Sequence, residues 1–513
     1  MRFWPFSRRP LPPGAGVIQQ RIGAPQNRTM VGQLERFYKA AQPDRLTAGW
    51  PMLPVPTDWI IRWSLRPLRA RSREQVENND YARRFVNLVT SNVVGPHGAV
   101  LQAQIRHANG DPDDKANKAI VEAWRDWGMR ENCDITGRMS WPEQQRLFMR
   151  TVAQDGEALV RIIRGKSAGK HAIALQHLDP ELLDVFYSNT LPNGNWIAQG
   201  VEFNPFGRPV AYHLMQPMRP SSEQYVYSYY GKHYIRVPAT DIIHEYLPER
   251  VDQKRGLPWL ATALMRMKML DGYEEAAVVA ARVGAAKLGV WESPTGEEYT
   301  GDDTDTQGNT IMDADPGEFV QAPTGVKLNK WDPAYPDSQF SAFCEQILRG
   351  ISSGLGVCYN TLANDLKSVN YSSIRHGTLE DRELWKMLQD WMIGVFPVRM
   401  YREWLDMQML TGALQVPTQS GTPASFKPQN MDKYRAVRFQ GRRWSWVDPQ
   451  KDASANVLLM QEGMQSRSAI MRDRGDDPET VWREIAQERK LMTDLGLEDI
   501  LAEIANEKIT ERI

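Results

Sequence analysis

The sequence predicts an α+β fold, because helix-like and strand-like segments come in separate blocks. Three helical patterns precede five strand-like segments between residues 157 and 237. A long helical pattern over 258–287 then leads into a short β-rich insert at 288–336, and a second helix returns from that insert. With 513 residues, the chain has room for about three domains and a substantial hydrophobic core.

The composition is that of an ordinary globular protein, with 42% hydrophobic and 24% charged residues. Lys and Arg number 62 against 63 Asp and Glu, so the net charge is −1. Proteins that hold duplex DNA tightly usually have a basic surface, because phosphate contacts supply much of their affinity. The balanced charge therefore argues against a tight DNA-binding protein.

The cysteines, the hydropathy and the N-terminal segment indicate the environment in which the protein works. Cys133, Cys344 and Cys358 are odd in number and lack metal-site spacing, which favours buried free thiols in a reducing compartment. No run of 18 apolar residues is present, so no membrane span is expected. Residues 1–30 contain five arginines and no acid, and we expect a mobile basic arm that either touches nucleic acid or scaffold protein or is a plain tail.

The first helical block is predicted from apolar spacing. Val76, Phe85, Val89 and Val93 favour one helix from residue 65 to about residue 94, ended by Gly95 and Pro96. Its first half is basic, which indicates a solvated face or intersubunit ion pairs, with DNA contact as the alternative. The basic residues are Arg62, Arg66, Arg69, Arg71 and Arg73.

Two shorter helices follow over 113–127 and 140–152, the second with Ser140 and Glu143 at capping-box positions. Strands are then expected at 157–165, 171–178, 196–204, 209–215 and 233–237. A turn at 205–207 separates the third strand from the fourth.

The long helix over 258–287 is rich in Ala and Gly in its second half, which would allow close packing against other helices. A buried helix within one chain is the alternative. A second helix is expected over 337–353, capped by Ser338 or Asp337, then a third over 371–393 and a fourth from Pro397. After residue 444, three helices are expected, each ended by a glycine at 463, 475 or 496. The first and third start with Pro449 and Pro478, and the second starts at Ser466.

The insert is predicted to hold strands at 288–293, 317–323 and 326–331 around an acidic loop. Residues 297–318 contain eight acids and no base. A calcium-binding loop of the EF-hand type starting at Asp303 is excluded, because its twelfth position is Ala314 and a bidentate Glu is needed there. A solvated loop is therefore favoured.

Catalytic motifs are missing from the sequence. The string from Gly165 to Lys170 lacks phosphate-loop spacing and lies between two predicted strands, so it indicates a hairpin turn. His244-Glu245 has no second His four residues after the first, as a zinc protease requires. Acidic residues distant in sequence could still meet in space to form a nuclease site.

Three stretches resemble the lambda-type portal family of tailed phages. They are HEYLPERVDQKRGLPWL at 244–260, SVNYSSIRHGTLEDRELW at 368–385 and the closing pattern WVDPQKDASA, GMQSR, RGDDPE. The likeness in layout covers residues 65–497 and is most specific between 241 and 385. It implies a ring of about twelve copies at one capsid vertex, through which double-stranded DNA enters and leaves. The neutral charge suits such a channel, since tight phosphate contacts would slow the DNA.

The resemblance also implies a portal-type arrangement of parts. These are a basic arm at 1–30, an α+β wing at 31–257, stem helices at 258–287 and 337–357, a β-rich clip at 288–336, a tunnel loop and helix with a return to the wing at 358–447, and a helical crown at 448–513.

It further implies candidate site residues of three kinds. The DNA-channel residues of the tunnel loop are Lys367, Ser368, Asn370, Tyr371, Ser372 and Arg375, with Ser373 and His376 beside them. The ring-packing residues are Ala276, Ala277, Ala280, Ala281 and Gly284. The clip residues for motor or connector docking are Trp291, Asp302, Asp303, Asp305, Asp313, Asp315 and Glu318. For Asn370 and the serines, helix capping is an alternative role that is compatible with DNA contact.

The function implied is structural, with no catalysis, cofactor or metal. The expected partners are other copies of the chain, the packaging terminase, a head-tail connector and the capsid or scaffold protein. The expected location is the virion, with the host cytoplasm during assembly. The alternative function is a monomeric or dimeric nucleic-acid enzyme using carboxylate-bound Mg²⁺, which the mass of the particle would distinguish.

Overall fold

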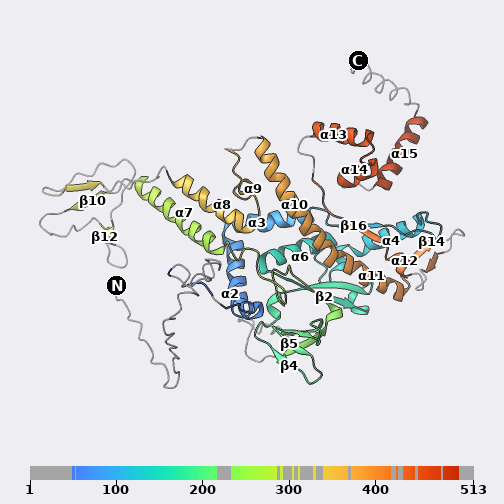
Figure 1. The fold of residues 1–513 in the computed structure, drawn as a ribbon, viewed down its shortest axis with the longest axis horizontal. Helices are drawn as coiled ribbons and strands as arrows, with labels where there is room; N and C mark the ends of the chain where they lie inside the picture. The colour runs from blue at the N-terminus through green and yellow to red at the C-terminus, as the bar shows by residue number, and fades with distance from the viewer. Residues whose placement is uncertain are drawn as a thin grey trace, which may run out of the picture. The chain divides into compact units, whose positions relative to one another are not determined.

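A computed structural model describes residues 45, 49–51, 53–215, 233–285, 289–292, 303–304, 310–311, 327–330, 339–367, 371–417, 423–425, 431–444, 449–474 and 478–495. The chain divides into two units, Met1–Pro56 and Thr57–Ile513. The helices and strands described below belong to the second unit, and they confirm a mixture of helices with small sheets (Figure 1).

The sheets are small and antiparallel. A three-stranded sheet has the order β3-β2-β9, and a five-stranded sheet runs in order from β4 to β8. Their strands are β2 (Ala158–Arg164), β3 (Ile173–Leu178), β4 (Asn189–Thr190), β5 (Trp196–Ala198), β6 (Val201–Phe203), β7 (Pro209–Met215), β8 (Tyr234–Pro238) and β9 (Ile242–Glu245). Two-stranded pairs join β1 (Val100–Ala103) to β16 (Val437–Gln440) and β14 (Gln415–Pro417) to β15 (Pro423–Ser425).

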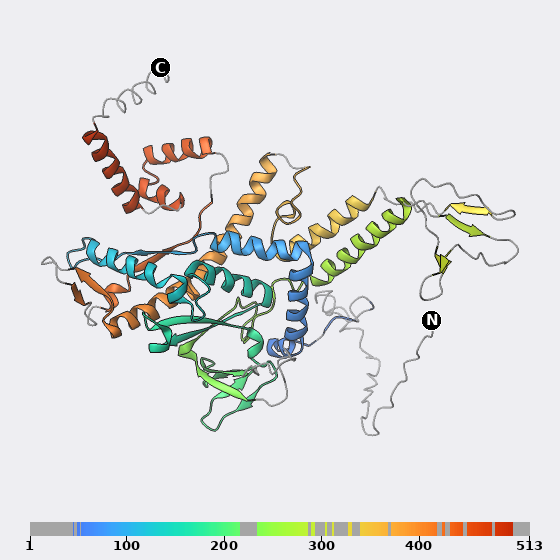
Figure 2. The ribbon, with the colours of Figure 1, turned by 180° about the vertical axis from the view of Figure 1, so that it is seen from behind.

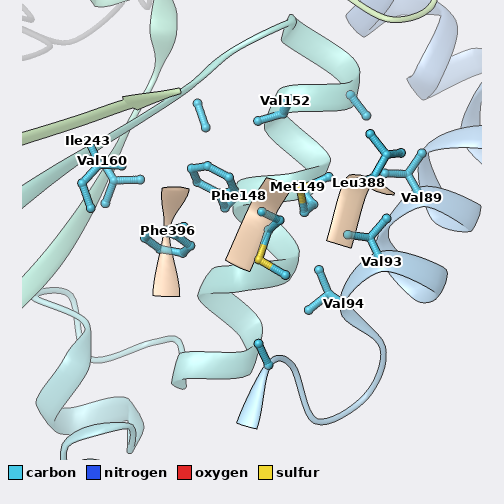
Figure 3. Close-up of a cluster of buried hydrophobic side chains, with 14 of the residues drawn as sticks. Val89, Val93, Val94, Phe148, Met149, Val152, Val160, Ile243, Leu388 and Phe396 are labelled. Carbon is cyan, nitrogen blue, oxygen red and sulfur yellow. The ribbon is translucent and has the colours of Figure 1, made fainter. Parts of the chain in front are cut away.

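The main core surrounds α6 (Trp141–Asp155), whose start has the predicted capping box of Ser140 and Glu143. Figure 3 shows Phe148, Met149 and Val152 of this helix directed toward side chains of other elements. Phe148 stacks on Phe396 with ring centroids 4.5 Å apart. The core thus joins the N-terminal helices, the three-stranded sheet and the later helices α10 (Tyr371–Val395) and α11 (Pro397–Thr411) into one body.

The prediction of one helix from residue 65 to about 94 is wrong. The segment forms α2 (Thr57–Asn78) and α3 (Asp80–Val89), followed by a π-helical turn over Thr90–Val94. Asn79 separates the two helices, because its extended backbone leaves the helical path and its side chain accepts hydrogen bonds from Tyr81 N and Ala82 N. The apolar spacing continues across this cap, so periodicity alone could not reveal the break.

The predicted strand at 196–204 is also wrong, because it is a hairpin of β5 and β6. Gln199 and Gly200 turn the chain with φ of 52° and 85°. Two successive left-handed residues are typical of a tight hairpin turn that matches strand twist. The predicted turn at 205–207 is confirmed, and so is the hairpin turn between β2 and β3.

The long helix is α7 (Leu264–Ala285), which begins six residues later than predicted. It packs antiparallel against α8 (Phe340–Leu355), and the two lie side by side in both views (Figures 1 and 2). The Tyr273 ring stacks on Phe340 at 5.5 Å, and Thr262 donates to the Gly354 carbonyl at 3.2 Å. The predicted caps of the second helix, Asp337 and Ser338, lie outside the described residues.

Other helix predictions are confirmed. They include α4 (Asp114–Trp127), α10, α11 from Pro397, and three C-terminal helices. The latter are α13 (Pro449–Gln461), α14 (Arg467–Arg474) and α15 (Pro478–Asp494). In the structure Asp113 caps the start of α4. Short helices also occur at α5 (Arg130–Cys133), α9 (Tyr359–Ala363) and α12 (Met431–Tyr434).

Candidate functional site

The segment that leads into α7 is anchored on one buried carboxylate, Glu157. This residue precedes β2, and its side chain is fully buried. It accepts hydrogen bonds from Arg69 Nη2 at 2.9 Å, from Arg255 Nε at 2.9 and 3.0 Å, and from the backbone N–H of Gly256 at 3.0 Å. His244 Nε2 lies 3.0 Å from Glu157 Oε2.

Arg255 is equally buried and has every side of its guanidinium satisfied. Besides Glu157, it donates to the carbonyl oxygens of Leu183 at 3.0 Å, Gln199 at 2.9 Å and Pro180 at 3.2 Å. Pro180 and Leu183 lie in the connection from β3 to β4, and Gln199 lies in the hairpin turn between β5 and β6 of the five-stranded sheet. One arginine therefore fastens the approach to α7 to both sheets, which fixes where the long helix leaves the body.

The electrostatics of this cluster favour an ionised Glu157. Burial opposes ionisation, but Arg255, His244 and Arg69 outweigh it and hold the pKa of Glu157 well below its ordinary value. The cluster, defined here as Glu157, Arg69, Arg255 and His244, is therefore a paired and hydrogen-bonded network. Removing one partner would leave an uncompensated buried charge.

Two glycines allow the chain to pass through this point. A Cβ atom at Gly256 would overlap the carbonyl oxygen of Gly156, and a Cβ at Gly156 would overlap the backbone of Leu257. Gly156 also has a φ of 91°, in the left-handed region that favours glycine. This close contact between the two backbone segments explains why a glycine follows Arg255 in the 244–260 stretch.

The arginines of α2 have a role that the sequence did not suggest. Arg69 is buried and pairs with Glu157 and Glu181, the latter at 2.7 Å. Arg73 pairs with Asp155 and Asp179, each at 2.7 Å. For these two residues the expectation of a solvated face, intersubunit pairs or DNA contact is wrong, because acids of the same chain hold them.

Hydrogen bonds to Asp381 of α10 hold the first half of the loop between α8 and α10. This buried carboxylate accepts from the backbone N–H of Cys358 at 2.9 Å and from Thr361 Oγ1 at 2.8 Å. Arg84 of α3 donates to the Thr361 carbonyl at 2.8 Å. Burial and Asp381 raise the pKa of the Cys358 thiol to about 12, so it stays protonated. The short helix α9 is thus fixed to two neighbouring helices.

The second half of this loop carries exposed groups. Asn364 ends α9 in the left-handed conformation, with φ 55°. Asp365 accepts from the Lys367 backbone N–H and from Tyr359 Oη, both at 3.0 Å, which lowers the pKa of Asp365. Leu366 and Lys367 are exposed. The backbone at Lys367 is thus held by a turn while its ammonium group faces solvent.

The other predicted channel residues are described only in part. Ser368 and Asn370 lie outside the described residues, as do the side chains of Tyr371, Ser372 and Ser373. Arg375 is half-buried and engaged in an interaction, and His376 is exposed.

The small residues predicted to pack in a ring have different environments. Ala276 is exposed, Ala280 and Ala281 are half-buried, and Ala277 is only 7% exposed because its own chain covers it. Gly284 lies on α7, where burial is not described. Of the four alanines, whose burial is described, Ala276 has the most accessible side chain.

The insert between α7 and α8 contains β10 (Gly289–Glu292) paired with β13 (Lys327–Lys330), which confirms its first and third predicted strands. A second pair joins β11 (Asp303–Thr304) to β12 (Thr310–Ile311). Trp291 lies opposite Leu328, and Asp303 lies opposite Ile311. The strand predicted at 317–323 lies outside the described residues, together with Asp302, Asp305, Asp313, Asp315 and Glu318.

The described part of the chain contains neither a cluster of metal-ligating side chains nor a membrane-spanning helix. No group of three or more His, Cys, Asp or Glu side chains there could hold a metal ion. Within the same residues, no helix combines the length and apolarity needed to cross a membrane.

The family match and the similar phage proteins all indicate one family. Residues 43–389 match the family described as phage portal protein, lambda family. The chain is 32% identical over 478 residues to the probable portal protein of Halomonas phage phiHAP-1, covering 90% of this chain and 88% of that one. It is 21% identical to portal protein B of Escherichia phage lambda, covering 82% of each. A chain in the virion of a native gene transfer agent particle is similar with 12% identity and a TM-score of 0.42, over 81% of this chain and 95% of that one.

Proposed function

The chain belongs to the lambda family of phage portal proteins, and we propose that its copies form a closed ring at one capsid vertex. Genomic double-stranded DNA passes through the ring, driven inward by a separate motor ATPase and released later at ejection. The family match over most of the chain carries this proposal. The ring of about twelve copies follows from the family and not from any residue of the chain.

The exposed apolar side of α7 is the proposed contact between neighbouring copies in the ring. One side of α7 is buried against its own chain through Met267, Leu270 and Ala277. Another side is apolar but exposed, with Met265 and Met269 at 66% and 69% exposure, followed by Gly272, Ala276 and Val279 at helical spacing. Within its own chain α7 packs against α8 and α2, and this further apolar side stays exposed, so it is suited to a partner from another copy.

The loop after α9 is the proposed DNA contact. Lys367 is exposed on a backbone turn held by Asp365, and its neighbour Leu366 is 63% exposed. One such lysine per copy neutralises few phosphates, so the contact would be weak and sensitive to salt. Weak contact is what a channel requires, because the DNA must slide through it.

The insert between α7 and α8 is the proposed docking element for the motor and the head-tail connector. Its acidic residues would attract basic partner surfaces and repel DNA. The role is structural, and the ATPase belongs to the partner. The experiment below also distinguishes this structural role from that of a nucleic-acid enzyme using carboxylate-bound Mg²⁺.

The mass of the purified particle tests the proposal. We expect rings of about 700 kDa, twelve times 58.6 kDa, with a central hole in axial electron-microscope class averages. The same preparation should not hydrolyse DNA or ATP in the presence of Mg²⁺. A monomer or dimer that cleaves DNA, with the cleavage abolished by changing an acidic residue of this chain, would overturn the proposal.

A further inference from the structure

Among their described residues, the three C-terminal helices have only half-buried and exposed apolar side chains, so they do not form a fully buried core within one chain. None of the side chains described in α13, α14 and α15 is buried. The contrast with α6 is clear, since that helix of similar length buries Phe148, Met149 and Val152 among others. Helices of this length are marginal in water unless an apolar face is covered.

Large apolar side chains are nevertheless present on these helices and face solvent. Val457 and Leu458 of α13 are 45% and 58% exposed, and Trp482 of α15 is 40% exposed. Leu491 and Leu495, one helical turn apart, are 58% and 62% exposed. Together with Met464, at 77%, they form what we name the C-terminal apolar surface. So many exposed apolar groups on one short segment indicate an interaction surface.

The charge of the segment helps to identify the partner. Residues 449–495 contain seven basic and nine acidic side chains. A surface for DNA or for anionic lipid would need an excess of positive charge. Nearly balanced charges of both signs instead suit contact with an identical segment, where each sign can meet its opposite. The segment also reaches its own body through an exposed ion pair between Arg483 and Asp114 at 2.8 Å, which leaves the apolar groups uncovered.

We infer that α13, α14 and α15 complete their folding only on assembly, when the C-terminal apolar surface packs against the same segment of a second copy of this chain. The inference rests on the proposed ring. It adds that this segment is loosely ordered in the free subunit and becomes rigid through intersubunit contact. Assembly thereby couples to local folding, as expected where binding supplies the core that one chain lacks.

Hydrogen exchange in the full-length protein tests this inference. Backbone amides of 449–495 should exchange at least about tenfold more slowly in purified rings than in dilute unassembled subunits. The double variant Leu491→Glu, Leu495→Glu should lose this protection. Because both leucines are exposed in the single chain, the substitutions should leave the exchange of α6 unchanged.

The matched control is Lys490→Glu, which places a carboxylate on the adjacent residue, in line with Arg483 and Asp494 on the charged side of α15. It should keep the protection seen in the wild-type ring. Equal protection of the segment in rings and free subunits would overturn the inference, as would protection that appears only on adding duplex DNA. Rings with an unprotected segment would also overturn it while leaving the ring intact. Absence of wild-type rings, measured by particle mass, would instead contradict the proposed function.

Discussion

Arg255 and Glu157 form an ion pair in which both side chains are completely buried, with Arg255 Nε 2.9 Å from Glu157 Oε1. The pair joins the approach to α7 to the start of β2. Three carbonyl oxygens and the Gly256 N–H complete its hydrogen bonds. An ion pair of this kind contributes less to net stability than to the uniqueness of one geometry, here the exit direction of the long helix.

Replacing Arg255 by Leu should strongly destabilise the subunit. The change leaves Glu157 buried with fewer partners and three carbonyls without a donor, which should cost about 3–5 kcal/mol in free energy of unfolding. Denaturant unfolding of the variant and wild type measures this. The control Lys118→Ala breaks an exposed pair with Glu122 and should change stability by less than about 0.5 kcal/mol. Equal effects of the two substitutions would contradict the role given to Arg255.

Gly256→Ala should destabilise the same region by steric overlap. The added Cβ would collide with the Gly156 carbonyl, so one of the two backbone segments must move. The matched change is Gly394→Ala in α10, where a Cβ meets nothing within 4 Å and where alanine should be neutral or stabilising by up to about 1 kcal/mol. Thermal unfolding of both variants checks the prediction, which fails if Gly256→Ala unfolds at the wild-type temperature.

Glu245 gives the subunit a dependence on pH. It lines a cavity of about 1000 Å³ between β9 and the five-stranded sheet. Burial raises the pKa of Glu245 to about 7, and Arg399, 3.9 Å away, only partly opposes this. The folded state then binds the proton more tightly than the unfolded state, so stability should fall as pH rises from about 4.5 to about 7.

Glu245→Gln should remove this dependence and make the subunit more stable than wild type at pH 8, by less than about 3 kcal/mol. Unfolding measured at a series of pH values compares the two proteins. The control Glu122→Gln lies on an exposed part of α4 and should leave the pH profile unchanged. Parallel profiles for wild type and Glu245→Gln would refute the raised pKa.

Local signals in the sequence predicted much of the fold. The Ser140 capping box, Pro397 at a helix start and the helical periods of α4 and α10 act within a few residues, so they can be read without the tertiary structure. The break at Asn79 was missed, since an asparagine cap inside a continuous apolar period gives little sequence signal. The hairpin at Gln199 was missed because only Gly200 marked it.

The buried cluster could not be predicted for a different reason. Arg69, Glu157 and Arg255 are separated by 88 and 98 residues, and pairing over such distances depends on the fold. Charged residues are usually exposed, so a basic run on a helix indicates a solvated face. The resemblance located the 244–260 stretch, but the carboxylate that it binds became apparent only from the structure.

Ala276→Trp should impair ring assembly more than subunit folding. Its side chain is exposed in one chain, so an added indole meets solvent in the free subunit but would separate packed neighbours, at about 1–3 kcal/mol for each interface. The adjacent Ala277→Trp should instead destabilise the subunit itself, because Ala277 is buried. Ala280→Trp, at a half-buried position, should affect both. Particle mass and subunit unfolding separate these effects, and normal rings from Ala276→Trp would refute packing through this position.

Lys367→Ala should leave ring assembly intact and alter how DNA is packaged or retained. The ammonium group is exposed and is the only base between residues 364 and 373, while the turn around it is held by the backbone N–H of Lys367 and not by its side chain. Removing it deletes one phosphate contact per copy without disturbing the loop, so the salt dependence of DNA retention should weaken. Lys367→Arg, which keeps the charge, is the control and should behave like wild type. Packaged DNA length and its retention are measured in particles across a range of salt concentrations. If Lys367→Ala matches wild type throughout, the residue has no part in holding DNA, and the loop serves only to connect α9 to α10.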